Sequence, residues 1–239
     1  MDLLYAFLDK YWGDSADATM EQRCRVLASF FGWAHATERI SRDPAKHLVP
    51  PRRRPTTRRA HELEEIRYIA SSQEPRDEAA LLLLGRLALR KNDLRELRLR
   101  DIDLAHDLIH IRRGKGGKPA ELPIVYEDLR KALYFHLQIR GGHPDEYLLY
   151  PKTDRHRPLT PSALYRWFKR CLERAGASDF PMHELRHSAG DHLWRRTGNL
   201  VLAQQLLRHE SIETTRQYLH PTREDLVAGM HLADEEADK

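Results

Sequence analysis

The chain has 239 residues, of which 41% are hydrophobic and 32% charged, as in a globular protein of one large domain or two small ones. Its longest apolar run, residues 79–84, is far too short to cross a bilayer, and the N-terminus shows no export signal. Cys24 and Cys171 are isolated and do not form a disulfide framework. We therefore expect a cytoplasmic protein that does not act at a membrane.

The basic residues are mostly arginines, 31 of 40, and the formal net charge is +4. The planar guanidinium fork suits phosphate oxygens, although arginine-preferring codon use in a GC-rich genome would produce the same bias. The charge permits nucleic-acid binding without establishing it.

Residues 1–50 are predicted to form a short helical domain. Apolar residues recur at helical spacing in two stretches before residue 40. Thr19 and Gln22 have the spacing of a capping box for the second helix.

A Pro/Arg linker is predicted at residues 51–59. Its prolines favour an extended backbone, and its charges all have one sign, so we favour a strap along a phosphate backbone over an ordinary solvated linker. The candidate DNA-binding residues are Arg52, Arg53, Arg54, Arg58 and Arg59.

Residues 60–239 are predicted to form a mainly α domain with a small antiparallel β-sheet. Strands at 108–111 and 120–124 flank a Gly-Lys-Gly-Gly turn. The expected helices lie near residues 61–71, 76–89, 128–140, 161–175, 181–196, 200–207 and 213–219.

The sequence His-Glu-Leu-Arg-His at 183–187 matches the zinc-protease pattern. On that interpretation His183 and His187 bind zinc, Glu184 is the general base, and Glu210 is a distant ligand. Pro181 opposes it, because it places His183 in the first helical turn. Among 14 histidines, a chance match is unsurprising.

The same helix also suits phosphate. His183 and Arg186 project from one face near the helix N-terminus, where backbone N–H groups favour an anion. His209 is predicted to lie at a helix junction, with Tyr218 on the helix that follows. Taken alone, each of these last two is better explained as a structural residue.

Five ordered segments together resemble the tyrosine recombinases, the phage integrase and Xer-type family. They are Arg-Lys-Asn-Asp-Leu at 90–94, Leu-Arg-Leu-Arg-Asp-Ile-Asp-Leu at 97–104, Gly-Lys-Gly at 114–116, His-Glu-Leu-Arg-His at 183–187, and Leu-Leu-Arg-His at 206–209 continuing to Tyr218. The resemblance covers roughly residues 60–220. It implies a tyrosine-recombinase catalytic domain preceded by a short helical N-terminal domain.

The resemblance also implies the catalytic residues. By motif position they are Arg90, Lys115, His183, Arg186, His209 and Tyr218, with Lys118 a weaker candidate for the hairpin lysine. Tyr218 would attack a DNA phosphate, and the arginines would neutralise the transition state. The phosphotyrosyl bond conserves the energy of the broken linkage, so the resemblance implies no cofactor and no metal.

Several positions depart from the family pattern. Asp93 stands where the family usually has glutamate, and Ala88 and Arg208 replace common glycines. Residues 1–50 supply about two helices where the family's core-binding domain usually has about four. None of these changes removes a catalytic side chain, so an active enzyme is expected.

The expected partners are double-stranded recombination sites, three further copies of the chain in a tetramer, and an accessory DNA-bending or directionality factor. An apolar tail containing Leu226, Val227, Met230 and Leu232 would dock on a neighbouring protomer or on its own core. Two other functions stay open, a catalytically limited DNA-binding regulator of recombination and the zinc hydrolase. Type IB topoisomerases share the chemistry but tend to be larger.

Overall fold

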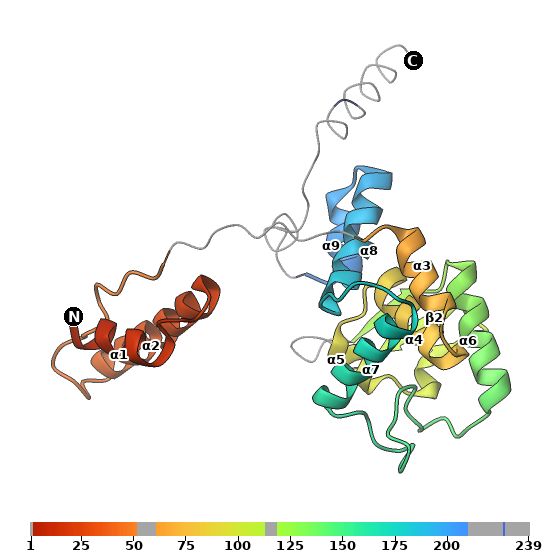
Figure 1. The fold of residues 1–239 in the computed structure, drawn as a ribbon, viewed down its shortest axis with the longest axis horizontal. Helices are drawn as coiled ribbons and strands as arrows, with labels where there is room; N and C mark the ends of the chain where they lie inside the picture. The colour runs from red at the N-terminus through yellow and green to blue at the C-terminus, as the bar shows by residue number, and fades with distance from the viewer. Residues whose placement is uncertain (1, 52–60, 113–118, 210–226, 228–239) are drawn as a thin grey trace. The chain divides into compact units, whose positions relative to one another are not determined.

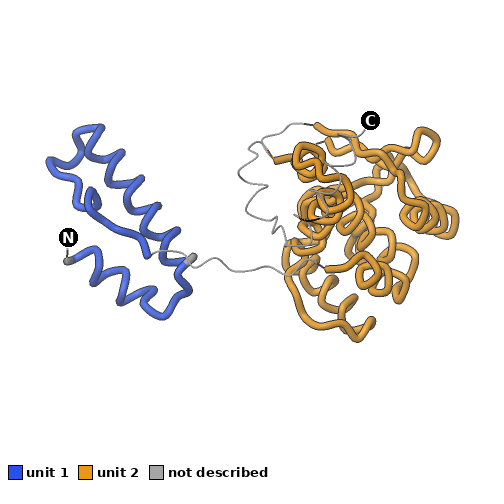
Figure 2. Tube along the Cα trace, turned by 90° about the horizontal axis from the view of Figure 1, so that it is seen from above, with its two compact units in different colours: residues 1–57 blue, residues 58–239 orange. Residues whose placement is uncertain are grey.

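The computed structural model describes residues 2–51, 61–112, 119–209 and residue 227. The chain divides into two compact units, Met1–Thr57 and Arg58–Lys239, which Figure 2 colours separately. The predicted boundaries at residues 50 and 59 stay predictions. Several predicted features lie outside the described residues: the five linker arginines, Lys115, Lys118, Glu210, Tyr218, the helix at 213–219, and Leu226, Met230 and Leu232 of the tail.

The described part of the first unit, residues 2–51, contains two helices, α1 (Asp2–Trp12) and α2 (Asp17–Ala36). The helices pack against each other, and the Tyr5 hydroxyl accepts a hydrogen bond of 3.0 Å from the Val49 N–H. The predicted capping box at Thr19 is wrong. The helix begins at Asp17, whose position in the first turn suits the positive end of the helix dipole.

The second unit is mainly helical with one small sheet, which confirms the predicted fold class (Figure 1). Its elements are α3 (Leu63–Ser71), α4 (Pro75–Arg86), α5 (Lys91–Glu96), η1 (Leu99–Asp101), β1 (Ile102–Asp103), β2 (Leu108–Ile111), β3 (Ala120–Pro123), α6 (Glu127–Arg140), α7 (Pro161–Arg174), α8 (His183–Thr197) and α9 (Leu200–Leu207).

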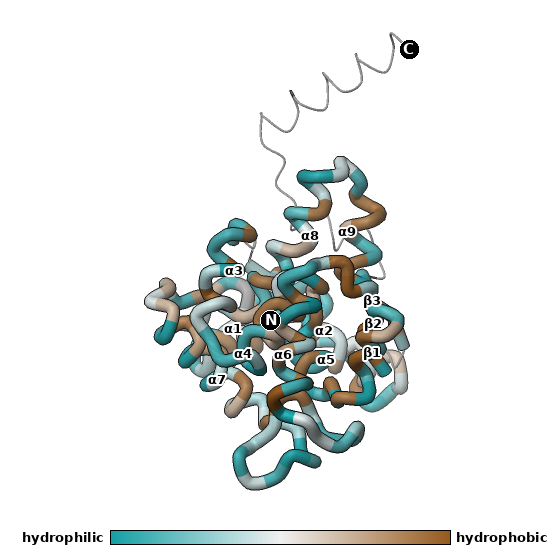
Figure 3. The backbone as a smooth tube through the Cα atoms, turned by 90° about the vertical axis from the view of Figure 1, so that its right-hand side faces the viewer, coloured by the Kyte–Doolittle hydropathy of each residue, from teal (hydrophilic) through white to brown (hydrophobic). Residues whose placement is uncertain are grey.

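Helix α4 is the centre of this unit. Its residues 79–84 are at most 1% exposed, and the helix packs against α3, α6 and α8. Apolar contact on several sides explains why residues 79–84 are continuously hydrophobic and lack a single apolar stripe. In the other elements, hydrophobic and hydrophilic residues alternate along the backbone (Figure 3). No helix in the described part of the chain is long and apolar enough to span a membrane.

The sheet has three antiparallel strands in the order β1-β2-β3. Ile109 of β2 is fully buried and pairs with Ile102 on one side and Leu122 on the other. The two longer strands were predicted, whereas β1 has only two residues and gives no alternating pattern. The segment 113–118, which contains Lys115, connects β2 to β3.

Candidate active site

Arg90 lies immediately before α5, where the chain leaves the buried segment that follows α4. Its backbone N–H donates to Asp93 Oδ2 at 3.2 Å, which fixes the start of the helix. Its Nη2 donates to the carbonyl oxygens of Arg208, at 2.5 Å, and of Leu207, at 3.4 Å. The first candidate arginine is therefore held against the end of α9.

Arg186 reaches the same place from α8. The residue is only 5% exposed, and its Nη1 donates to the carbonyl of Ala88 while its Nη2 donates to the carbonyl of Leu207. Arg90 and Arg186 thus share one acceptor, the Leu207 carbonyl. A guanidinium has five donors in a planar fork, so contacts of this kind fix its plane as well as its position.

His209 follows directly after this shared peptide. Its N–H donates to the Gln204 carbonyl at 3.1 Å, and the Gln204 side-chain amide donates to the His209 carbonyl at 3.1 Å. His183 is the first residue of α8, in the first turn as Pro181 predicts. Its ring meets that of His187 edge-on, with centroids 5.2 Å apart. The structure therefore brings Arg90, Arg186 and His209 to one end of α9.

The two positions at which the family usually has glycine both have left-handed backbones. Ala88 has φ 51° and Arg208 has φ 47°. This conformation costs a residue other than glycine about 1–2 kcal/mol. The carbonyl oxygens of these two residues are bound by Arg186 and Arg90 respectively. Two of the four non-glycine residues with positive φ in the described part of the chain thus bind the candidate arginines through their carbonyls, the others being Glu38 and Asp107.

Sequence reasoning missed the partner of Asp93. Its Oδ2 accepts from Arg208 Nη2 at 2.5 Å, and the two side chains are 4% and 13% exposed. The carboxylate therefore contacts both the N–H of Arg90 and the residue before His209. The Arg-x-x-Asp spacing is the signal that could have indicated a helix-capping carboxylate, but no local pattern points to a cation over a hundred residues away.

His61 is a second group that sequence reasoning missed. Its buried ring lies between Glu65, 3.1 Å from Nδ1, and Glu184, 3.2 Å from Nε2. Its backbone N–H donates to Ser188 Oγ at 2.8 Å. Glu184, which the zinc interpretation makes the general base, is thus paired with His61, in the segment before α3. Within the described residues, no three His, Cys, Asp or Glu side chains form a group that could hold a metal ion.

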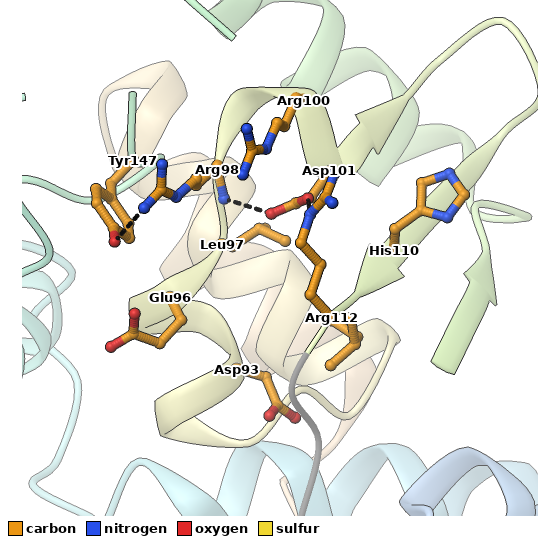
Figure 4. Close-up of a pocket in the computed structure, with 10 residues that line it drawn as sticks. Asp93, Glu96, Leu97, Arg98, Arg100, Asp101, His110, Arg112 and Tyr147 are labelled. Atoms are coloured by element: carbon orange, nitrogen blue, oxygen red, sulfur yellow. Dashed lines mark hydrogen bonds and ion pairs between the residues drawn. The ribbon is translucent and has the colours of Figure 1, made fainter. Parts of the chain in front are cut away.

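A pocket of about 360 Å³ lies between α5 and the hairpin (Figure 4). Arg98 donates to the Tyr147 hydroxyl at 2.9 Å and, through its backbone N–H, to Asp101 at 3.0 Å. Asp101 also binds Arg112 at the end of β2. This network fastens the hairpin base from which the segment with Lys115 begins.

Comparisons with known proteins agree with this arrangement. The phage integrase family pattern matches residues 58–225. The tyrosine recombinase XerC of Herpetosiphon aurantiacus is 32% identical over 228 residues, which cover 89% of this chain and 72% of the relative. The tyrosine recombinase XerC of Pseudomonas fluorescens is 33% identical over 214 residues, covering 85% and 71%.

Solved structures show the same fold. XerH recombinase in a post-cleavage complex with palindromic difH superposes with a TM-score of 0.73 and 22% identity, covering 97% of this chain and 69% of that one. A lambda integrase dimer bound to a COC′ core site gives a TM-score of 0.70 and 21% identity, covering 90% and 63%. On the family match and the identity to XerC, the chain belongs to the phage integrase family.

Proposed function

We propose that the chain is a site-specific DNA recombinase that cuts and rejoins strands through a 3′-phosphotyrosyl intermediate. The observation that carries the proposal is that Arg90 and Arg186 both donate to the Leu207 carbonyl, two residues before His209. Two fixed guanidinium groups at one place suit the charge that develops on a phosphate under attack. Family membership supports the same reaction.

The proposed cleavage step balances without a co-reactant. Tyr218 Oη attacks the phosphorus and forms the phosphotyrosyl bond, while the bond from phosphorus to the 5′-oxygen breaks. His183 accepts the tyrosine proton, and Lys115 gives a proton to the departing oxygen. Attack by another strand's 5′-hydroxyl reverses these transfers and releases Tyr218.

The remaining groups stabilise the transition state in this proposal. Arg90 and Arg186 neutralise charge on the non-bridging oxygens, and His209 donates a hydrogen bond to one of them. Because the covalent intermediate conserves the energy of the phosphodiester, the step requires no nucleotide cofactor.

Double-stranded DNA is the proposed partner, supported by the lambda integrase dimer on its core site and by XerH on difH. We further propose that four copies act together on two paired sites, with an accessory bending or directionality factor, in the cytoplasm. The arginines at 52–54, 58 and 59 would follow the phosphate backbone and make binding strongly salt-dependent.

A nicked suicide substrate tests the chemistry. The recombination site would be found by selecting bound duplexes from a randomised pool. A nick in that duplex is then placed so that the short fragment released by cleavage diffuses away. Wild-type protein should form a covalent complex that survives denaturation, and Tyr218→Phe should form none. Tyr165→Phe, an exposed tyrosine on α7, is the matched control and should behave like wild type.

Two results would overturn this assignment. Covalent trapping by Tyr218→Phe would mean that another residue is the nucleophile. Selective binding without cleavage by the full-length wild-type protein would favour the DNA-binding regulator.

A further inference from the structure

A second pocket lies at the opposite end of α4 from Arg90. Its volume is about 450 Å³, and it is lined by the start of α4 and the ends of α6 and α7, including Arg76, Asp77, His136, Arg140 and Arg174. Helix α4 has 12 residues, so at 1.5 Å per residue the two ends are about 18 Å apart. The pocket is therefore separate from the candidate active site.

The neighbourhood of this pocket has an excess of positive charge. Asp77 pairs with both Arg76 and Arg174, while Glu146, which is not part of the lining, pairs with both Arg140 and Arg155. Each of these two carboxylates thus pairs with two guanidinium groups. Glu74 is the remaining acidic residue of the lining and is exposed, so four arginines and three carboxylates leave an excess of one positive charge.

Three of these arginines surround one aromatic ring. Arg140 lies 4.6 Å from the centroid of the Tyr150 ring, and Arg76 and Arg155 each lie 5.6 Å from it. Cations this close repel one another, and an aromatic face offsets only part of that repulsion. An anion between them would offset it further.

The buried donors of Arg140 are incompletely used. Its side chain is 7% exposed, and only Nη2 reaches Glu146. Nε and Nη1 are buried without an acceptor among the described residues, and His136 Nε2 is buried without a hydrogen-bond partner. A buried polar atom without a partner costs about 1–3 kcal/mol, so these groups favour a ligand that supplies acceptor oxygens.

The start of α4 adds backbone donors. Pro75 occupies the first turn, and the N-cap residue Glu74 makes no side-chain cap. The N–H groups of Arg76 and Asp77 have no partner within the helix at this position. Residues that carry donors therefore line the pocket on α4, α6 and α7, and charged donors together with a helix N-terminus suit a phosphate-class oxyanion.

We propose that this pocket binds a small oxyanion of the phosphate class, held by Arg140, Arg76, Arg174 and the first turn of α4. The site is independent of the recombination chemistry and lies on no residue assigned to it. His136 reports on its occupancy. Burial, together with Arg140 and Arg76 and against the opposite effect of Asp77, lowers the pKa of His136 to about 4. A bound anion would raise that pKa.

The test is a titration of the full chain with inorganic phosphate, followed by NMR of ¹³C-labelled histidine rings. The His136 signal is assigned by its loss in His136→Leu. Wild type should show a saturable shift of this signal and a rise in the pKa of His136, beyond the effect of chloride at equal ionic strength. The signals of His183 and His209, in the same spectra, report phosphate at the catalytic site separately.

Variants then identify the ligands. Arg140→Met and the more exposed Arg174→Gln should each weaken phosphate binding at His136 by roughly tenfold, the effect of losing one charged hydrogen bond. Arg174 is half exposed, so its replacement should leave the fold intact. Arg130→Gln, which removes an exposed, carboxylate-paired arginine elsewhere, is the matched control and should bind like wild type.

Three outcomes would overturn the proposal. The first is a response confined to His183 and His209, and the second is equal weakening in Arg130→Gln. The third is displacement of phosphate from His136 by a DNA duplex of mixed sequence, which would assign the pocket to the DNA interface. Each of these outcomes can be measured whether or not Tyr218 proves to be the nucleophile.

Discussion

The ion pair between Asp93 and Arg208 joins the start of α5 to the residue after α9. A second contact joins the same two segments. The guanidinium of Arg90 donates to the carbonyl of Arg208, and Asp93 accepts from the Arg208 side chain. The two segments that supply Arg90 and His209 are thus bound together twice, through backbone and side chain.

Breaking this pair should show strong coupling between its members. Asp93→Ala and Arg208→Gly each leave a largely buried charge without its partner, whereas the double variant leaves neither. We expect the free energy of unfolding of the double variant to exceed the additive expectation by about 1–3 kcal/mol. Urea denaturation of the four proteins measures this, and additivity within about 0.5 kcal/mol would show that the pair contributes nothing.

Gly190 allows α9 to lie close against α8. A Cβ at this position would stand 2.6 Å from Leu207 Cδ1 and 2.9 Å from its Cγ, and Leu207 is fully buried. Gly190→Ala should therefore destabilise the catalytic unit by about 1–3 kcal/mol and lower the cleavage rate. Thermal unfolding and suicide-substrate cleavage measure the two effects.

Gly32→Ala on α2 is the contrasting change. Nothing lies within 4 Å of a Cβ at this position, so the substitution gains only helix propensity, about 0.5–1 kcal/mol. If Gly190→Ala were equally stabilising, the close approach of α8 and α9 would be disproved.

Acid should destabilise the protein partly through His136. Its pKa is about 4 in the folded chain against 6.5 for an ordinary histidine, so the ring is neutral in both the folded and the unfolded chain well above pH 6.5. As pH falls from 6.5 to 4 the unfolded chain takes up a proton that the folded one does not, and stability decreases. His136→Leu should reduce the loss between pH 7 and 5 by about 2 kcal/mol. Denaturation of both proteins in phosphate-free buffer measures the loss of stability between pH 7 and 5. An equal loss in wild type and His136→Leu would contradict the prediction.

Cys171 should be unreactive in the folded protein. It is fully buried, and burial raises the pKa of its thiol to about 12, so almost no thiolate exists at pH 8. In a Cys24→Ser variant, Ellman's reagent should react within seconds in urea and far more slowly without it. Rapid native labelling would show that the α7 core opens readily.

Longer elements were predictable because they repeat a pattern. The apolar run at 79–84 helped to predict a helix there, and the Gly-Lys-Gly-Gly pattern at 114–117 predicted a turn between two strands. Helix α5 has only six residues, too few for a period of 3.6 to be recognised. The start of α2 was misplaced because Thr19 offered a capping pattern, whereas the N-cap is Ala16, three residues earlier.

The sequence indicates candidate catalytic side chains, whose roles stay predictions, but it does not indicate the contacts that support them. Family motifs indicate Arg90, Arg186 and His209, and the structure brings these together. The ion pair of Arg208 and the pairing of His61 with Glu184 join residues more than a hundred positions apart. Contacts of that range depend on tertiary packing, and a single sequence gives no local sign of them.

The Leu207 carbonyl has one more implication. A carbonyl oxygen is a neutral acceptor, so the bonds it receives from Arg90 and Arg186 orient both guanidinium groups without adding negative charge. A carboxylate at this position would align the two guanidinium groups equally well, but it would compete with the DNA phosphate for their positive charge. Because a single atom accepts from both, a displacement of the end of α9 would disturb both guanidinium groups at once.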